Sequence, residues 1–337
     1  MVVSGARQDK IDNVKNSIAA TLVCFCSVLL SFAVSAFAQQ YPAKPVRIIV
    51  PAAPGGGTDL IGRVFAQKFS KAFAQSFVVD NKGGAGTTLG TDLVAKSPPD
   101  GHTLLLTHVS LSFNASYYRR LPYDTVKDFA PIALVASQPY IVVVHPSLPA
   151  KNIGELVALA RSRPGSISYA SGGAGSGPFM AAEQFKILTR IDLVHVPYRG
   201  SGLAFTDVIS GQVPVMFATV SLALPHVRAG RVRALASSAA RRLAAMPELP
   251  TIAEGGVREY DFSTWYGLLA PAGTPRATVT RLSDEAAKIL DESDTRERFA
   301  GDGIEPLKST PDEFAAFLAR DIERWSKVVK ATGLHAD

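Results

Sequence analysis

The sequence predicts an α/β fold of two lobes, each a mostly parallel sheet flanked by helices. Short apolar runs typical of buried strands alternate with helical stretches along the chain, which favours parallel sheets covered on both faces. The order strand, glycine-rich loop, helix begins near Ile48 and again near Ile167. No long Gly/Ser-rich or Pro-rich linker divides the halves, so we expect strands to cross between the lobes.

Five strands are expected in the first half of the chain. They are predicted at Val46–Pro51, Phe77–Asp80, Thr103–Thr107, Ile132–Ala136 and Tyr140–His145, the last two joined through Pro139. Helices are predicted at Thr58–Phe73 and Thr87–Lys96. The segment Ser97–Gly101 places Pro and Gly where a turn needs them.

The second half repeats this alternation. Asn152 followed by Glu155 has the spacing of a capping box, so a helix should begin there, and Pro164 should end it. Helical patterns separate the following strands, and three more helical stretches close the chain. These strands are predicted at Ile167–Ser171, Leu193–Tyr198, Val213–Ala218, Val232–Ser237 and Trp265–Ala270.

The first 38 residues have the features of a secretory signal peptide. A basic start precedes the apolar run Ile18–Val34, and Ala36 and Ala38 supply the small residues of a cleavage site. Cleavage would make Gln39 the first residue of the mature chain. An uncleaved membrane anchor is the alternative, although the apolar run is slightly short for a membrane span.

Both cysteines, Cys24 and Cys26, lie inside this segment. The mature protein would therefore have no disulfide, no thiol nucleophile and no thiolate metal ligand. Export without cysteines suits a chain large enough to be stable without cross-links.

Composition excludes several classes of protein. Of 337 residues, 47% are hydrophobic and 19% are charged, which argues against a disordered chain. The net charge of +6 comes without a nucleic-acid-binding pattern, because no aromatic residues are interleaved with the densest basic stretches, 228–233 and 241–242. We expect a solvated basic face and no nucleic-acid partner.

Three glycine-rich loops, Pro54–Asp59, Gly83–Thr88 and Ser171–Pro178, each follow a predicted strand and open a predicted helix. A helix N-terminus offers unpaired N–H groups and a partial positive charge, and glycine lets a ligand approach the backbone. Each loop alone could be a tight turn with a capping hydroxyl. Three in one chain favour a small anion held at the carboxyl ends of the strands.

Motifs for other chemistry fail in this sequence. No phosphate-binding GxxxxGK[ST] occurs, and the dinucleotide register G-x-G-x-x-G breaks at Leu89 and at Pro178. The serine-nucleophile pattern G-x-S-x-G fails at Ser176 and at Ser201. No histidines have metal-ligand spacing, and His108, at the end of a strand, is the one placed to touch a ligand. We therefore expect no cofactor, no metal and no catalytic residues.

An ordered set of motifs resembles a known family. VRIIVPAAPGGGTD, NKGGAGTTLGTDLVAKSPPDGHTLLL, HVPYRG, AGRVRALA, LPTIAEGG and WYGLLAPAGTP resemble the Bug-type periplasmic solute-binding receptors of tripartite tricarboxylate transporters. The resemblance implies a Venus-flytrap fold, with residues 39–139 and 264–337 in the first lobe and 140–263 in the second. It also implies a periplasmic, monomeric protein that delivers a small carboxylate to inner-membrane transporter subunits.

The resemblance and the glycine loops together predict the ligand site. We expect one carboxylate to bind at Gly56, Gly57, Thr58 and Asp59, with Gly86 and Thr87 opposite. Asp59 is assigned to capping or to ordering the loop rather than to direct contact, because it would repel a carboxylate. Selectivity is predicted in the second lobe, at the strand ends and helix starts that carry Ser171, Ser176, Thr219 and Arg199.

Di- and tricarboxylates, amino acids and aromatic acids are the ligands that the resemblance implies. Relatives often carry an acidic residue where this chain has Ala218, so an amine-bearing ligand would lack a partner there. The alternative function is a secreted α/β hydrolase or lyase acting on a small carboxylated substrate. An enzyme needs a positioned nucleophile or an acid–base pair, and the sequence shows neither.

Overall fold

The computed structural model describes residues 41–336. The chain divides into two compact units at Ala43, and the elements described here belong to the unit Lys44–Asp337. The predicted signal peptide and both cysteines lie outside the described residues. Among residues 41–336, no helix combines the length and the apolar character needed to cross a bilayer.

The first lobe is built on one sheet. Its outer strands are parallel, with β1 (Val46–Val50) between β2 (Phe77–Asn81) and β3 (Thr103–His108). Next to β3 lies β9 (Ser263–Pro271), which is antiparallel to β3 and to the long strand β4 (Phe129–Val144). The short β10 (Glu305–Pro306) also pairs with β4.

The second lobe continues the sheet from the far half of β4. Here β5 (Ser168–Ser171) is parallel to β6 (Val194–Pro197) and to β7 (Val215–Thr219). Both β7 and β8 (Arg233–Ser237) are antiparallel to β4. The strand order β2-β1-β3-β9-β4-β7-β5-β6 confirms the predicted α/β fold of two lobes, with parallel outer strands and antiparallel crossing strands.

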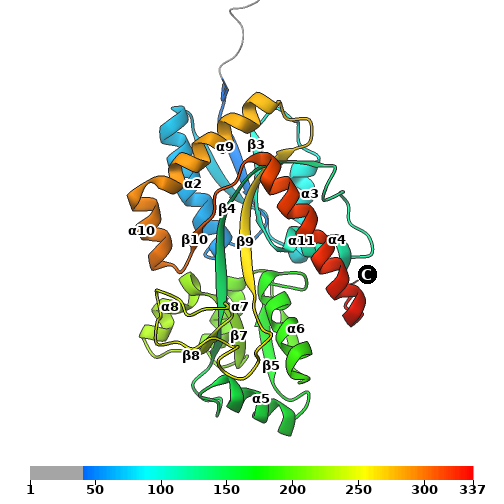
Figure 1. Cartoon of the computed structure of the whole chain (residues 1–337), viewed down its shortest axis with the longest axis vertical. Coiled ribbons are helices and arrows are strands. Elements are labelled where there is room, and N and C mark those ends of the chain that lie inside the picture. Colours follow the sequence, from blue (N-terminus) through cyan, green and yellow to red (C-terminus); the bar gives the residue numbers. More distant parts are fainter. Residues whose placement is uncertain (1–40, 337) are drawn as a thin grey trace, which may run out of the picture. The chain divides into compact units, whose positions relative to one another are not determined.

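Strand β4 passes from one lobe to the other (Figure 1). Residues Phe129–Pro139 pair with β9, and residues Tyr140–Val144 pair with β7 and β8. The prediction of two strands interrupted at Pro139 is wrong. Proline cannot donate to a ladder, but Pro139 forms the last pair with β9, so it stands where the strand changes partners and interrupts neither ladder.

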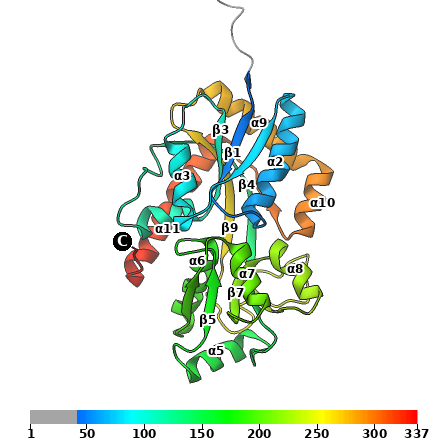
Figure 2. The ribbon, with the colours of Figure 1, turned by 180° about the vertical axis from the view of Figure 1, so that it is seen from behind.

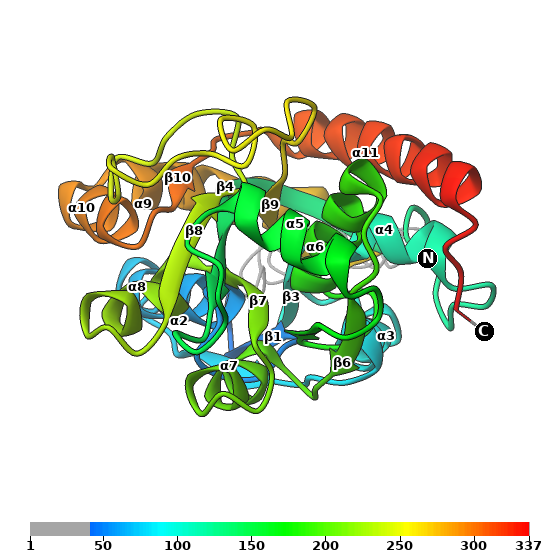
Figure 3. The ribbon, with the colours of Figure 1, turned by 90° about the horizontal axis from the view of Figure 1, so that it is seen from below.

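Helices cover both lobes. In the first, α2 (Gly57–Phe73) packs beside α9 (Arg276–Asp291) on one face (Figure 2). On the other face, α4 (Ser110–Tyr117) packs against α11 (Pro311–Thr332), as Figure 1 shows. The first lobe also contains η1 (Ala85–Thr87), α3 (Thr88–Ala95) and α10 (Ser293–Gly301). The second lobe carries α5 (Ile153–Ser162), α6 (Gly177–Thr189), α7 (Ser201–Ile209) and α8 (Val220–Arg228), seen around its strands in Figure 3.

Local sequence explains which helices were predictable. The Asn152 side chain accepts the Glu155 N–H at 2.8 Å, which confirms the predicted start of α5. Helix α4 was not predicted, because its sequence SLSFNASY is buried on nearly every side, including Ser112 and Asn114, and so lacks an amphipathic period.

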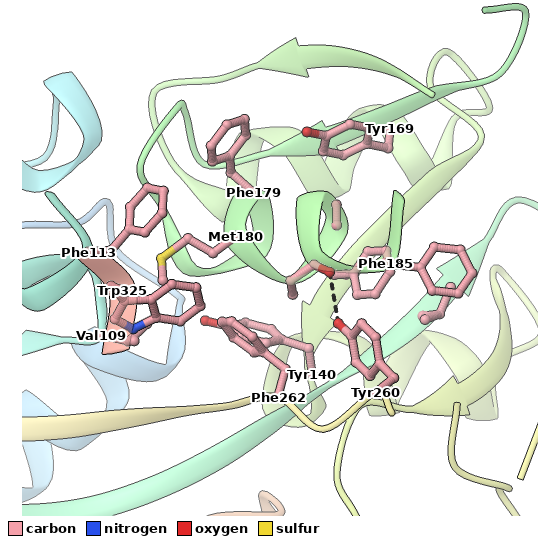
Figure 4. Close-up of a cluster of buried hydrophobic side chains, with 14 of the residues drawn as sticks. Val109, Phe113, Tyr140, Tyr169, Phe179, Met180, Phe185, Tyr260, Phe262 and Trp325 are labelled. Atoms are coloured by element: carbon pink, nitrogen blue, oxygen red, sulfur yellow. Dashed lines mark hydrogen bonds between the residues drawn. The ribbon is translucent and has the colours of Figure 1, made fainter. Parts of the chain in front are cut away.

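An aromatic core joins the lobes behind the crossing strands (Figure 4). Trp325 of α11 meets Phe113 of α4 edge-on, with ring centroids 5.4 Å apart, and lies 5.9 Å from Phe262. Tyr117 contacts Phe179 of α6 at 5.6 Å. Such rings bury large apolar areas, so this cluster stabilises the packing of residues from both lobes.

Candidate functional site

A small cavity of about 50 Å³ lies between the two lobes. Its walls come from the loops that follow β1, β2, β5, β6 and β7, together with the side chains of His108, Tyr140 and Tyr266. All five loops leave the carboxyl ends of their strands, which is where open α/β sheets bind ligands. We call it the interlobe cavity.

Five helices begin at the interlobe cavity, and the N-cap residue of each lines it. These residues are Gly56 of α2, Thr87 of α3, Ser176 of α6, Gly200 of α7 and Thr219 of α8. None of the five makes a side-chain capping hydrogen bond. The first N–H groups of these helices are therefore free of side-chain caps at the cavity wall.

Of the described helices that begin elsewhere, α4, α9 and α10 also lack a side-chain cap, whereas α5 and α11 have one. Asn152 caps α5, and Thr310 with Glu313 forms a complete capping box on α11. Ser176 has the right side chain for a cap, yet its Oγ is buried without a hydrogen-bond partner in the described structure, and the residue is only 6% exposed. A buried hydroxyl without a partner carries a desolvation penalty, which a ligand oxygen in the cavity would remove.

Asp59 holds the first glycine loop from behind. Its carboxylate accepts hydrogen bonds from the Gly55 N–H and from Arg63 Nε, each at 3.0 Å, and from Asn81 Nδ2, also at 3.0 Å. Burial alone would raise the pKa of Asp59, but these hydrogen bonds outweigh it, and the pKa lies below the usual value. Asp59 does not line the cavity, and its carboxylate forms hydrogen bonds that order the loop.

Ser171 lies behind the third glycine loop. Its hydroxyl is 2.6 Å from His195 Nε2 and accepts the Gly173 N–H at 3.1 Å. The His195 ring stacks on Tyr169 with centroids 4.9 Å apart, and burial lowers the pKa of His195 to about 4. Ser171 is fully buried and does not line the cavity, so the structure places it in support of the loop.

His108 presents a neutral ring to the cavity. Its Nδ1 accepts the Ser110 N–H at 3.2 Å, so the proton of the neutral ring sits on Nε2. Burial lowers the pKa of His108 to about 4. At neutral pH the residue therefore offers an uncharged N–H donor.

The charged groups around the cavity have one sign. Arg199 is exposed at its rim and has no ion-pair partner among residues 41–336. Within the same described residues, no Asp or Glu lines the cavity. The cavity lining therefore favours an anion and offers no carboxylate to pair with an ammonium group.

The two lobes touch beside the cavity. Gly86 of η1 lies against the carbonyl oxygen of Ala174, so close that a Cβ on Gly86 would overlap it. The Tyr118 hydroxyl donates to the same Ala174 oxygen at 3.2 Å. On the other side, Gly200 lies against Ala53. We call these contacts the interlobe seam.

Most of the predicted site residues line the cavity, and three do not. Those in the lining are Gly56, Gly57, Thr58, Thr87, His108, Ser176, Arg199 and Thr219. Asp59 and Ser171 lie behind the loops, and Gly86 lies at the seam.

Sequence reasoning missed Tyr140 and Tyr266, which line the cavity from the crossing strands β4 and β9. Nothing local marks them, because each stands inside an apolar strand. In the described part of the chain, His, Cys, Asp and Glu form no group of three that could hold a metal ion.

Comparison with known proteins places this chain among transporter receptors. The model of the tripartite tricarboxylate transporter family receptor matches residues 61–334. The structure of the periplasmic binding protein BugD gives a TM-score of 0.85 at 31% identity, covering 88% of this chain and 100% of its own.

Two further structures carry ligands. Rpa4515 of R. palustris with adipate gives a TM-score of 0.84 at 33% identity, covering 87% of this chain and 99% of its own. MatC of Rhodopseudomonas palustris with bound malate gives a TM-score of 0.82 at 31% identity, covering 86% of this chain and 100% of its own.

Proposed function

The chain belongs to the family of tripartite tricarboxylate transporter receptors, and we propose that it captures a small dicarboxylate without an amino group in the interlobe cavity and delivers it to the membrane subunits of such a transporter. The observation that carries the choice of ligand is the convergence of five uncapped helix N-termini on one cavity. Each N-terminus carries roughly half a positive charge, and together they suit a doubly charged anion.

The placement of these helices suggests how two carboxylates are divided. The first lobe contributes the starts of α2 and α3, and the second contributes those of α6, α7 and α8. One carboxylate on each lobe would draw the lobes together, because the ligand then contacts both sides only in the closed arrangement. Adipate and malate, the ligands of the two relatives described above, are both dicarboxylates.

We propose that the moving bodies are residues 39–139 with 264–337, and residues 140–263. The change of partners along β4 between Pro139 and Tyr140 supports this division. In this proposal the protein is a periplasmic monomer released from a cleaved signal peptide, and its relative BugD is likewise a periplasmic binding protein.

An enzymatic role has little support at this site. Ser171 and His195 are the hydroxyl and imidazole that come closest to a nucleophile–base pair. Ser171 is fully buried and outside the cavity lining, so a bound substrate could not reach its oxygen. We therefore propose capture without turnover.

Calorimetry tests the proposed ligand class. Malate, succinate and adipate are titrated into the mature protein, with aspartate as the amine-bearing comparison. We expect binding of one or more dicarboxylates at one site per chain, with weaker binding of aspartate. Absence of binding by every dicarboxylate, or conversion of the ligand during incubation, would contradict the proposal.

Two variants separate ligand contact from helix capping. Ser176→Ala should lower affinity roughly 10- to 150-fold, the value of a hydrogen bond to a charged group. It should not lower the melting temperature of the free protein, because the hydroxyl that it removes is buried without a partner in the described structure. Asn152→Ala is the matched control, because Asn152 caps α5 away from the cavity. It should cost about 1 kcal/mol of stability and leave affinity unchanged.

A further inference from the structure

We propose that Tyr266 accepts a hydrogen bond from a hydroxyl group of the ligand, so that the receptor selects a hydroxy-dicarboxylate over the same acid without the hydroxyl. The inference rests on the proposed function, because it assumes that a dicarboxylate occupies the interlobe cavity. It follows from a chain of hydrogen bonds whose direction is fixed at one end.

The fixed end is a backbone carbonyl. Gln138 Nε2 lies 2.8 Å from the carbonyl oxygen of Asp302, at the end of α10. A carbonyl oxygen can only accept, so the nitrogen of the amide must face Asp302 and the oxygen must face the other way. This orientation brings Gln138 Oε1 to 2.9 Å from the Tyr266 hydroxyl.

The same logic fixes the phenol. The amide oxygen of Gln138 can only accept, so Tyr266 must donate its single proton to it. The tyrosine oxygen then has only lone pairs left. Burial raises the pKa of Tyr266 well above its usual value, so the phenol keeps its proton and the chain keeps its direction at neutral pH.

The Tyr266 hydroxyl lies close to the proposed ligand position. Tyr266 lines the interlobe cavity, and its hydroxyl lies against Gly57, the first residue of α2. A carboxylate at this helix start would lie beside an oxygen that cannot donate to it. A hydroxyl next to that carboxylate, as in a 2-hydroxy acid, could donate to Tyr266 while the carboxylate meets the helix N–H groups.

Other polar groups in the lining do not make this distinction. His108 Nε2 and the guanidinium of Arg199 can only donate, so both suit carboxylate oxygens. The hydroxyls of Ser176 and Thr219 rotate and can donate or accept. Tyr266 differs from these four side chains in having a fixed accepting role, and an acid without a hydroxyl would leave it unpaired.

The test compares paired ligands by calorimetry. L-malate, D-malate and succinate form one set, and 2-hydroxyglutarate and glutarate form a longer one. We expect the wild-type protein to bind the hydroxy acid roughly 5- to 150-fold more tightly than its unsubstituted partner, the range for one buried hydrogen bond and its unpaired alternative. Tyr266→Phe should remove this preference by weakening the hydroxy acid and leaving the unsubstituted acid nearly unchanged.

Two more variants sharpen the comparison. Tyr140→Phe is the matched control, since Tyr140 is the other cavity-lining tyrosine and stands against Gly177 at the start of α6. Because Tyr140 also lines the cavity, any loss of affinity in this variant should fall equally on the hydroxy acid and the unsubstituted acid, and the preference should remain. Gln138→Met keeps the side chain's length but removes the acceptor, so the Tyr266 proton becomes free for a carboxylate. This variant should bind succinate or glutarate more tightly than the wild-type protein does.

Each outcome bears on the inference separately from the proposed function. Equal affinities for hydroxy and unsubstituted acids in the wild-type protein overturn the role of Tyr266 and leave dicarboxylate capture standing. A preference that persists in Tyr266→Phe overturns it as well. If Tyr266→Phe does not fold, the Gln138→Met titration decides, and unchanged succinate and glutarate affinities there overturn the inference. Failure of every dicarboxylate to bind refutes the proposed function itself.

Discussion

Substituting Gly86 by alanine tests whether the interlobe seam must close for the ligand to bind. Gly86 has a φ of +59° and faces the carbonyl oxygen of Ala174 on the other lobe. A Cβ there would overlap that oxygen and would also crowd the Tyr118 hydroxyl. Both neighbours form the seam, and Gly86 itself does not line the interlobe cavity.

The size of the effect follows from this overlap. Restoring normal van der Waals separation requires the seam to open by roughly 1 Å. The Tyr118 hydrogen bond of 3.2 Å would then be lost, and a ligand bound to both lobes would lose one of its charge-assisted hydrogen bonds. Such a bond is worth about 1.5–3 kcal/mol, so the affinity should fall roughly 10- to 150-fold.

Gly230→Ala is the matched control. Gly230 has a φ of +68°, close to that of Gly86, but no atom lies within 4 Å of a Cβ placed there. Both variants carry a similar left-handed backbone penalty of about 1 kcal/mol. The overlap at the seam adds to it in Gly86→Ala, so this variant should have the lower melting temperature. Calorimetry with malate or adipate should show weaker binding by Gly86→Ala alone. Equal affinities in the two variants would refute the argument that closing the seam limits binding.

Three further predictions concern single interactions. Tyr118→Phe removes the hydroxyl that donates to Ala174, and dissociation measured by stopped-flow should be a few-fold faster, with the association rate unchanged. Asp59→Asn removes a carboxylate whose pKa is lower in the folded protein than the usual 3.8. Such a carboxylate stabilises the folded state above pH 3.8, and this stabilisation is lost as the pH falls through the folded pKa. The melting temperature of the variant should therefore lie below that of the wild-type protein at pH 7 and approach it below about pH 3.8. The pKa of His108 is about 4 in the folded protein, against an ordinary value of 6.5, so the unfolded state binds more protons between these two pH values. The free energy of unfolding of the wild-type protein should therefore decrease as the pH falls from 6.5 to 4. Urea titrations of His108→Gln should show a smaller decrease over the same pH range.

The sequence predicted the fold because the informative signals are local. Apolar runs, glycine loops and the Asn152 cap each act within a few residues, and the structure confirms the α/β arrangement that they indicate. The predictions failed at elements whose structure depends on residues distant in the sequence. The local sequence predicts a strand break at Pro139. Strand β4 nevertheless continues past this residue, because its pairing changes there from β9 to β7. Helix α4 lacks an amphipathic period because neighbours surround it on all sides.

The site was predictable only in part, and for the same reason. Glycine and hydroxyl residues at helix starts point to the cavity from their own loops. Whether a hydroxyl is free to bind a ligand depends on residues far away in the sequence. The Ser171 hydroxyl forms a hydrogen bond with His195, whereas the Ser176 hydroxyl has no hydrogen-bond partner in the described structure. Tyr266 shows the limit most clearly, because its accepting role is set by Asp302 through Gln138, in segments far apart along the chain.

Uncapped helix starts connect the stability of this protein to its ligand. Replacing a good N-cap by a residue that makes no bond costs about 1 kcal/mol, and α2, α3, α6, α7 and α8 all begin without a side-chain cap at the cavity. Away from the cavity, α5 and α11 begin with side-chain caps, while α4, α9 and α10 do not. Ligand carboxylates would take the place of the missing caps, so binding and helix stabilisation become the same interaction. The empty protein should therefore be least stable at the helix starts that line the cavity, and amide hydrogen exchange there should slow on ligand binding while exchange at the starts of α5 and α11 stays unchanged.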